Sequence, residues 1–349
     1  MANINFDREY YKNLIAKHGY QELNISAIDF NLGDINKDIL QRKWLCHSKG
    51  YIFAKELLDK KSIVTTGIGI SGAPHMGTLG QIFNSIFLQN HGINTQFVLG
   101  DLDAYNGKKL SLSYVKELSE QYKSFITKLG YSTTDGNILR NQFDASEVTR
   151  TMYLIAKFIE DKDFDNVEED LHNFYSDKGK VDKDMSFRRK TSLTLMTADF
   201  IDLVINHSFT NVLVTLGVDE HKYVLFSEKI LERVIESGEI LPSDSIINFG
   251  AMYTHIIRGF NNYPKMSKSF PDSSINIEMK SDEIRNRILN ERTNKIPEED
   301  TVYQMMCLVS KFNSEELSKR YIACKEDKAL WMKYKNDYIE YLIDIFKLW

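Results

Sequence analysis

Apolar residues along this chain form short continuous runs that alternate with stretches of helical spacing. Four runs rich in apolar and β-branched residues predict buried strands. They are residues 62–67, 95–99, 211–216 and 245–249. After the first and third runs, apolar residues recur every three or four positions, which predicts helices. Strand, helix and strand within about forty residues form a βαβ unit, which predicts a parallel sheet with right-handed crossovers.

The two ends of the chain have helical spacing instead. Residues 1–60 are polar and aromatic and predict a helical N-terminal extension. Residues 276–349 contain almost no turn residues and predict a helical C-terminal domain. Residues 61–275 hold all four predicted strands. The fold class is therefore predicted as α/β, a Rossmann-like doubly wound parallel sheet with the helical N-terminal extension and the small helical C-terminal domain at its ends.

An acidic insertion interrupts the predicted sheet domain at about residues 158–186. From residue 160 to residue 184, ten carboxylates accompany four lysines. We expect a solvated helix or loop here, because like charges repel unless they are spread over an exposed surface. Paired carboxylates for acid–base chemistry are the alternative interpretation.

Glycine and aspartate turns follow three of the predicted strands. Gly67 opens the first turn, Gly100 and Asp101 form the second, and Gly217 to Asp219 form the third. In open α/β sheets, ligands bind beyond the carboxyl ends of the strands. The three turns are therefore expected to meet at one ligand site.

Composition narrows the class of protein but not its ligand. The chain has 349 residues, of which 42% are hydrophobic and 12% aromatic, enough for one large core and a smaller satellite. A net charge of −5 gives no overall attraction to nucleic acid. Three widely spaced cysteines predict buried thiols rather than a zinc or disulfide framework, and no metal site. The absence of a long apolar run predicts no membrane span and a cytoplasmic location.

The first turn carries a glycine-rich segment with a histidine, Ser71-Gly72-Ala73-Pro74-His75-Met76-Gly77-Thr78. Gly67, Gly72 and Gly77 remove side chains where a nucleotide would press against the backbone. The helix that begins near Gly77 offers free N–H groups and a positive dipole end to a phosphate. His75 can donate a further hydrogen bond to that phosphate, although a structural histidine is the alternative if it is considered alone.

A second segment, Lys265-Met266-Ser267-Lys268-Ser269, places two lysines and two hydroxyl groups within five residues. This composition suits a loop that binds polyphosphate. Lysine ammonium groups stabilise the charge that grows on phosphate oxygens during phosphoryl chemistry. A solvated lysine–serine turn is the alternative, and the glycine-rich partner segment upstream argues against it.

Together the two segments resemble the signature motifs of class I aminoacyl-tRNA synthetases. The resemblance gives Lys268 the larger share of transition-state contact, with Lys265, His75 and Thr78 as the other catalytic residues. It also implies an ATP site. The residues expected there are Gly67, Gly72, Gly77, Gly217, Asp219, Met266 and Ser267. Asp219 would accept a hydrogen bond from a ribose hydroxyl, and Mg²⁺ would accompany ATP.

Within class I, the chain is most similar to the tryptophanyl and tyrosyl subclass. The tail through Ile275 and the segment Leu195-Met196-Thr197-Ala198-Asp199 look like tryptophanyl enzymes, in which the aspartate accepts the indole N–H. Asp199 is thus the candidate for amino-acid specificity, with a structural aspartate as the alternative. The segment around Asp101 looks closer to tyrosyl enzymes and makes Asp101 a second amino-acid contact.

Several positions depart from the family pattern. Ile70 stands where proline is usual, Thr78 where histidine or asparagine is usual, Asp103 where histidine is usual, and Glu220 where glutamine is common. Ser192-Leu193 replaces a tyrosine–proline pair. The changes at Glu220 and at Ser192-Leu193 bear on the side-chain pocket and leave the choice of amino acid open.

The resemblance implies ATP-dependent activation of an aromatic amino acid, tryptophan rather than tyrosine, and its transfer to tRNA by a cytoplasmic homodimer. Only 84 residues follow Lys265, which is short for a domain that reads an anticodon. A paralogue that activates an amino acid for another acceptor is therefore an alternative. Two further alternatives are a nucleotidylyltransferase of the same superfamily and a catalytically silent tRNA-binding relative.

Overall fold

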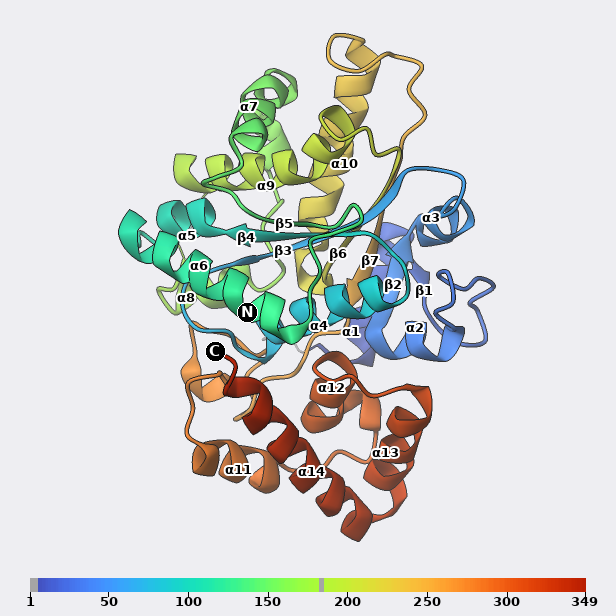
Figure 1. Cartoon of the computed structure of the whole chain (residues 1–349), viewed down its shortest axis with the longest axis vertical. Helices are drawn as coiled ribbons and strands as arrows, with labels where there is room; N and C mark the ends of the chain where they lie inside the picture. The colour runs from blue at the N-terminus through green and yellow to red at the C-terminus, as the bar shows by residue number, and fades with distance from the viewer. Residues whose placement is uncertain (1–5, 182–184) are drawn as a thin grey trace.

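The computed structural model describes residues 6–181 and 185–349, and its centre is a seven-stranded sheet (Figure 1). The strands are β1 (Gln21–Glu22), β2 (Trp44–Ser48), β3 (Ser62–Gly69), β4 (Thr95–Gly100), β5 (Ile138–Asn141), β6 (Asn211–Gly217) and β7 (Asn248–Thr254). Their order across the sheet is β1-β2-β7-β6-β3-β4-β5. The five strands from β7 to β5 run parallel, and β1 and β2 extend the β7 edge in antiparallel pairing.

Helices cover both faces of this sheet. Along β6, Leu213 belongs to one buried cluster and its neighbours Val212 and Val214 to another, because successive side chains of a strand point to opposite faces. The first cluster includes α4 (Met76–Asn90) and α6 (Leu112–Leu129). The second includes α7 (Ser146–Ile155), α9 (Phe187–Ile205) and α10 (His221–Ser237), on the opposite side in Figure 1. The doubly wound α/β prediction is confirmed.

The N-terminal 60 residues differ from the predicted helical extension. They contain α1 (Arg8–His18), α2 (Lys37–Lys43) and α3 (Gly50–Lys55), but also β1 and β2. Trp44 of β2 is buried and donates from its indole Nε1 to the hydroxyl of Thr215 on β6, 2.9 Å away. This segment is therefore part of the sheet. A five-residue strand between two short helices has too few apolar positions for its period to be recognised.

The C-terminal residues form four α-helices, as their spacing predicts. They are α11 (Ser281–Asn290), α12 (Thr301–Leu308), α13 (Ser314–Glu326) and α14 (Lys328–Phe346). On α14, Trp331, Tyr338 and Leu342 are buried, so the aromatic stripe is core rather than an exposed stacking surface. These helices join the buried cluster on the α4 face of the sheet. The domain boundaries at residues 61 and 276 remain predictions.

The other strand predictions hold with two exceptions. The run predicted at residues 245–249 begins later, as β7, and extends to Thr254. The sequence analysis missed β5, which has only four residues and ends in Arg140 and Asn141. Arg140 is buried because it pairs with the carboxylate of Asp202 at 2.8 Å, a contact that no local pattern predicts. The three cysteines are buried and unpaired, as expected.

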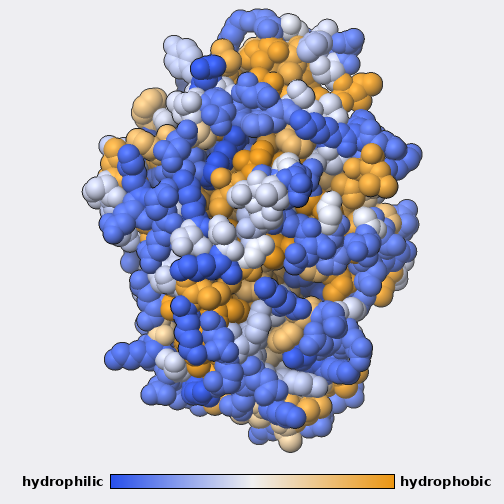
Figure 2. Space-filling view, in the orientation of Figure 1, coloured by the Kyte–Doolittle hydropathy of each residue, from blue (hydrophilic) through white to orange (hydrophobic). Residues whose placement is uncertain are grey.

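The acidic segment is more closely packed than predicted. It contains η1 (Ala156–Phe158), η2 (Asp161–Phe164) and α8 (His172–Asp177), and residues 182–184 lie outside the described residues. Asp163 is buried and pairs with Lys229 at 2.6 Å and with Arg233. Burial alone would raise the pKa of Asp163, but the hydrogen bonds from these two cations outweigh it and hold the pKa well below the usual range. Across the space-filling view in Figure 2, hydrophilic side chains cover most of the visible surface, and hydrophobic ones gather in separate patches. The expectation of a simply solvated insertion is wrong for the described part of this segment.

Candidate active site

The glycine-rich segment joins the end of β3 to the start of α4, and His75 caps that helix. The main-chain N–H of Thr78 donates to Nδ1 of His75 at 3.0 Å, and the Thr78 hydroxyl lies 2.8 Å from the same nitrogen. Nδ1 is thus the acceptor, and the neutral ring carries its proton on Nε2. Burial, reinforced by the charge of Lys268, lowers the pKa of His75 to about 3. His75 is therefore a neutral hydrogen-bond donor at physiological pH.

Thr78 is the hydrogen-bond partner of His75. Its side chain is buried and its hydroxyl contacts the imidazole, so it fixes the orientation of the ring. The sequence analysis placed Thr78 among the catalytic residues; in the structure it contacts His75 and also lines the cavity at this turn, and its catalytic role stays a prediction.

Glycines shape the backbone around this turn. Gly72 has a φ of +154°, which side-chain-bearing residues rarely adopt, and open space lies beside it. At Gly217, a Cβ would lie 2.7 Å from Oδ1 of Asp219, so only glycine lets that carboxylate fold back over the strand end. Gly67 and Gly77, two of the glycines expected at a nucleotide site, line a cavity beside this turn.

The lysine segment lies between β7 and α11, and hydrogen bonds attach the chain that follows it, at Ile275 and Ile277, to the glycine-rich segment. The N–H of Met76 donates to the carbonyl of Ile275 at 3.1 Å, and the N–H of Ile277 donates to the carbonyl of Pro74 at 3.0 Å. Two segments that are about 190 residues apart therefore form one structural unit, as expected for parts of a single site.

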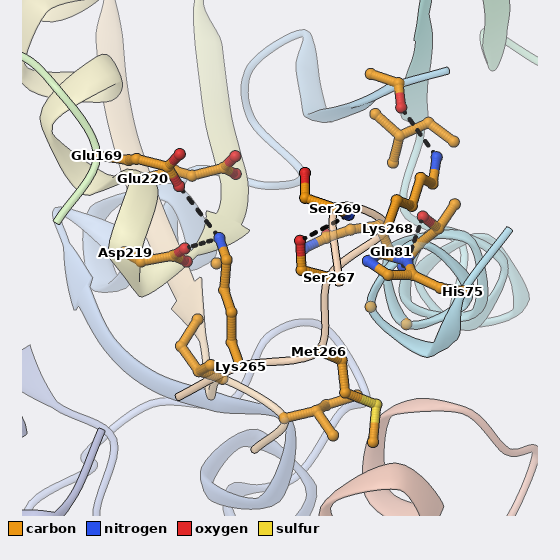
Figure 3. A pocket seen from close by; sticks show the side chains of 18 of the residues that line it. His75, Gln81, Glu169, Asp219, Glu220, Lys265, Met266, Ser267, Lys268 and Ser269 are labelled. Carbon is orange, nitrogen blue, oxygen red and sulfur yellow. Dashed lines mark hydrogen bonds and ion pairs between the residues drawn. The ribbon is translucent and has the colours of Figure 1, made fainter. Parts of the chain in front are cut away.

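Within this unit the two lysines have opposite surroundings. Lys265 forms ion pairs with Asp219 and with Glu169, the latter at 3.1 Å, and these carboxylates raise its pKa (Figure 3). Lys268 extends toward the His75 side of the cavity, where Nζ donates to the carbonyl of Gly69 at 3.1 Å. Burial, aided by the charge of Lys108, lowers the pKa of Lys268 to about 7. Near neutral pH, Lys268 is therefore only partly protonated, and a bound anion would favour its charged ammonium form.

The remaining residues of the segment hold the loop in shape. Met266 is buried. The N–H of Ser267 donates to the hydroxyl of Ser273 at 3.0 Å, and its own hydroxyl accepts from the N–H of Ser269 at 3.2 Å. Tyr122 of α6, which the sequence analysis did not single out, donates to the carbonyl of Gly72 at 2.8 Å. Its hydroxyl also accepts from Nζ of Lys268 at 3.2 Å, so one tyrosine links both segments.

Two adjoining cavities occupy the carboxyl ends of the parallel strands. The first, of about 310 Å³, is lined by both segments and by Asp219. The second, of about 320 Å³, lies toward α9 and is lined by Asp199. They share one wall, formed by Gly67, Ile68, Gly69, Lys108, Glu169, Val181 and Glu220. Ligands in the two cavities would therefore lie next to each other beside these shared residues.

Asp199 is a buried carboxylate that lines the second cavity. Its side chain is 2% exposed, and Oδ2 accepts from Nε2 of Gln142 at 2.8 Å. Burial raises the pKa of Asp199 to about 7. Oδ1 has no hydrogen-bond partner among residues 6–181 and 185–349, so it can accept a donor from a ligand in this cavity.

Asp101 does not line either cavity. Its Oδ1 accepts from the N–H groups of Leu102 and Phe143 at 2.8 and 3.0 Å, and its Oδ2 accepts from Asn141 at 2.8 Å. It ties the start of α5 (Asp101–Gly107) to the end of β5. The expectation that Asp101 contacts the amino acid is not met, and Asp103, two residues further on, lines the second cavity instead.

The sequence analysis also missed Glu169 and Gln142. Glu169 lay within the acidic run, where the charge pattern indicated a solvated surface. Gln142 follows β5, the strand that was not recognised. A polar residue directly after a parallel strand would have been the signal for Gln142. Without the position of β5 and the path of the acidic segment, neither Gln142 nor Glu169 could be assigned to the site.

The fold and the cavities define an α/β protein with two adjoining cavities at the carboxyl ends of its parallel strands. A model of the family described as class I tRNA synthetases for W and Y matches residues 58–341. The chain therefore belongs to the tryptophanyl and tyrosyl family of class I tRNA synthetases, and it is an aminoacyl-tRNA ligase. This family uses ATP, generally with Mg²⁺, and binds an amino acid and tRNA.

Individual relatives agree with this assignment. The tryptophan–tRNA ligase of Methanocaldococcus jannaschii is 22% identical over 307 residues, which cover 83% of this chain and 77% of that protein. The tryptophanyl-tRNA synthetase structure from Aeropyrum pernix K1 matches with a TM-score of 0.70 and 15% identity over 98% of this chain and 96% of that one. The tyrosyl-tRNA synthetase of Archaeoglobus fulgidus, complexed with L-tyrosine, matches with a TM-score of 0.67 and 14% identity, covering 89% and 96%. These structural matches show the shared fold.

Proposed function

We propose that the chain activates tryptophan with ATP to form tryptophanyl-adenylate and then transfers the amino acid to tRNA. The observation that carries this proposal is the pair of cavities with a common wall. ATP in the first cavity would place its α-phosphate at this wall, and the amino acid in the second would place its carboxylate there. Holding both reactants in contact removes much of the entropic barrier to their reaction.

In the proposed first step, an oxygen of the amino-acid carboxylate attacks the α-phosphorus. The bond from that phosphorus to the bridging oxygen breaks, and pyrophosphate leaves. Nε2–H of His75 and Nζ of Lys268 lie on the same side of the cavity and donate to the phosphate oxygens as their charge grows (Figure 3). In the second step a ribose hydroxyl of the acceptor attacks the carbonyl carbon, and AMP leaves.

The proposal gives Asp219 and Lys265 a coupled role. In the ligand-free protein, the Asp219 carboxylate is occupied by Lys265. A ribose hydroxyl can donate to the same carboxylate, and pyrophosphate oxygens can accept from the ammonium. ATP would therefore exchange this internal ion pair for two contacts with the nucleotide. Glu169 keeps its own contact with Lys265 at 3.1 Å and limits how far the lysine travels.

Mg²⁺ would be held chiefly by the ATP phosphates, the usual ligands for this ion in nucleotide sites. Asp219 and Glu169, the carboxylates beside the lysines, already pair with Lys265. Among the described residues, one group of three potential ligand side chains clusters within 4.8 Å, Glu147, Asp202 and His207. None of these lines either cavity, and Arg140 pairs with both carboxylates. The described residues that line the two cavities therefore include no such cluster, which leaves the ATP phosphates as the expected ligands.

We also propose that the protein works as a homodimer in the cytoplasm, on the basis of the resemblance alone. In the part of the chain that the structure describes, no helix is both long and apolar enough to cross a membrane. Family membership argues against the nucleotidylyltransferase alternative. Two alternatives remain, a paralogue that uses another acceptor and a catalytically silent tRNA-binding relative, and the assays below distinguish them.

Amino-acid-dependent exchange of pyrophosphate into ATP, measured over the twenty amino acids, tests the proposal. We expect a signal for tryptophan. Absence of exchange with every amino acid would overturn activation, and a signal for tyrosine alone would overturn the choice of tryptophan. Charging of total tRNA then separates a synthetase from a paralogue. Strong exchange without acylation of any tRNA would indicate another acceptor.

The affinity for ATP is expected to fall as the pH rises above 7. The pKa of Lys268 is about 7 in the free protein, and a bound polyphosphate would raise it, because opposite charge favours the ammonium. Binding then takes up a proton above pH 7, so affinity is highest below pH 7 and is lost as the free lysine deprotonates. Calorimetric titration should show Kd increasing roughly tenfold or more between pH 7 and pH 9.

The variant Lys268→Arg is the matched control for this pH dependence. Its guanidinium stays protonated throughout the range, so the dependence should disappear. His75 contributes nothing here, since it is neutral on both sides of pH 7. An equally steep pH dependence in the arginine variant would show that another group controls ATP binding.

A further inference from the structure

A groove larger than either cavity lies between the sheet domain and the C-terminal helices. Its volume is about 1440 Å³, against about 310 Å³ for the first cavity. One side is formed by the end of α8 and by the chain between β7 and α11, and the other by the chain between α11 and α12. The residues that line the groove line neither cavity. The proposed ATP and amino-acid sites therefore leave the groove unused.

The groove adjoins the proposed ATP site along two segments of chain. Pro264, which precedes the lysine segment, and Phe270, which follows it, line the groove, whereas both lysines of that segment line the first cavity. In α8, Phe174 lines the groove and its neighbour Tyr175 lines the first cavity. A molecule in the groove would therefore lie beside the lysine segment.

Cations outnumber carboxylates in the groove, although the chain as a whole has a net charge of −5. The cations are Lys178, Arg258, Arg292 and Lys295, and the carboxylates are Glu291 and Glu299. Arg258 lies 3.8 Å from Glu299. The other three cations are exposed and form no ion pair within residues 6–181 and 185–349. Exposed cations without internal partners suit phosphate groups, because each neutralised phosphate releases a counterion.

Aromatic rings and side-chain amides accompany these cations. Phe174, Tyr263 and Phe270 are half-buried, and the first two have their ring centroids 5.4 and 5.2 Å from that of Phe270. Four asparagines line the groove as well, Asn261, Asn262, Asn290 and Asn294. Rings can stack on unpaired bases, and amides can hydrogen-bond to base edges. This combination fits a single-stranded nucleic acid, whereas an acidic peptide would use the cations alone.

We propose that this groove binds the single-stranded 3′ end of the acceptor tRNA and holds it beside the proposed adenylate site. The exposed cations contact phosphates of the strand, and one of its bases stacks on Tyr263. This inference rests on the proposed function, since it takes tRNA as the acceptor. It adds the surface that would bring the attacking ribose hydroxyl to the reaction.

Binding of total tRNA to the full chain tests the surface. The same tRNA, trimmed of its single-stranded 3′ nucleotides by an exonuclease, is the comparison ligand. We expect intact tRNA to bind about tenfold or more tightly than trimmed tRNA, the effect of stacking and phosphate contacts at the strand. Equal affinities would overturn the proposal. Displacement of intact tRNA by polyglutamate as readily as by unlabelled tRNA would indicate a general anion surface and would also overturn it.

The cation contacts are tested by Arg292→Ala and Lys295→Ala, which each remove one exposed charge. The logarithm of the affinity for intact tRNA falls with the logarithm of the salt concentration, and each lost phosphate contact should reduce this slope by about 0.7. With trimmed tRNA, the slopes should equal that of the wild type. Lys333→Ala, at an exposed lysine of α14 outside the groove, is the matched control and should keep the wild-type slope. Unchanged slopes in both groove variants, or the same change with trimmed tRNA, would overturn these contacts.

The stacking contact is tested by Tyr263→Leu, which removes the ring. Binding of intact tRNA should weaken about five- to a hundredfold, the range for loss of one stacked base. Tyr263→Phe keeps the ring and should bind within about twofold of the wild type. An equal loss in both variants would show that stacking is not involved. If the leucine variant does not fold, the exposed cation variants still decide the proposal.

These outcomes are separate from those of the proposed reaction. Pyrophosphate exchange needs no tRNA, so it is measured on each variant beside tRNA charging. In the double variant Arg292→Ala/Lys295→Ala, the ratio of charging to exchange should fall about tenfold or more, because two charged contacts to the strand are lost. A ratio equal to that of the wild type would overturn the role of the groove. Absence of exchange in the wild type would instead remove the proposed activation, while tRNA binding still reports on the groove.

Discussion

Replacement of Lys268 by alanine is expected to slow amino-acid-dependent pyrophosphate exchange about a thousandfold, the effect of removing a charged group aimed at a developing oxyanion. Among residues 6–181 and 185–349, Nζ of Lys268 donates hydrogen bonds to two neutral oxygens, those of Gly69 and Tyr122. Its charge therefore has its largest effect when phosphate is present and growing in charge. The loss should appear in kcat more than in KM for ATP, because the contact strengthens in the transition state.

The fold should survive this change. Lys268 is half-buried, and removing an ammonium whose pKa is already lowered to about 7 relieves part of a desolvation cost, so the thermal unfolding temperature should not fall. Lys280→Ala, at an exposed lysine outside both cavities, is the matched control and should leave exchange unchanged. Exchange within threefold of the wild type in Lys268→Ala would contradict the role given to this lysine.

Substitution of Asp199 by asparagine is expected to lower kcat/KM for tryptophan about a hundredfold or more and to leave KM for ATP nearly unchanged. Oδ2 of Asp199 already accepts from Gln142, so the asparagine oxygen would keep that bond and its NH₂ group would face the cavity. An N–H donor of the ligand would then meet another donor. Sites built to bind a polar group lose this much when the pairing fails, because buried groups are left unsatisfied.

This prediction separates a role in specificity from a structural one. Asparagine resembles the protonated carboxyl group that a pKa of about 7 allows, so the free energy of unfolding should change little. Steady-state exchange over a range of tryptophan and ATP concentrations gives the two KM values. Asp135→Asn, at an exposed aspartate, is the control. A parallel loss of affinity for both substrates, or a large fall in stability, would assign Asp199 to the structure instead.

Much of the fold followed from local patterns, for reasons of burial. Strands of a parallel sheet are covered on both faces, so β3, β4 and β6 appear as continuous apolar runs. The helix α4 combines apolar residues at helical spacing with a capping residue, His75, at its start. In contrast, β5 ends in polar residues that distant partners satisfy, such as Asp202 for Arg140, and β2 is a five-residue strand between two short helices. These two strands could not be recognised from the chain alone.

The same distinction applies to the site. Residue type and spacing in the sequence by themselves indicated two candidate phosphate-binding segments and the parallel sheet that carries them. The resemblance of these segments to one enzyme family indicated the reaction. These are properties of short contiguous stretches, where glycine, histidine and lysine act through backbone freedom and charge.

Only the tertiary structure decided which groups face one another. In α5, residues two positions apart point to nearly opposite sides of the helix, and packing against β5 determines that Asp101 faces inward and Asp103 faces the cavity. Likewise, Glu169 meets Lys265 only because the acidic segment folds back over the strand ends. Pairings between distant segments depend on chain path and packing, which no local pattern encodes. The sequence thus determined the kind of reaction, and the fold decided the surroundings of each reacting group.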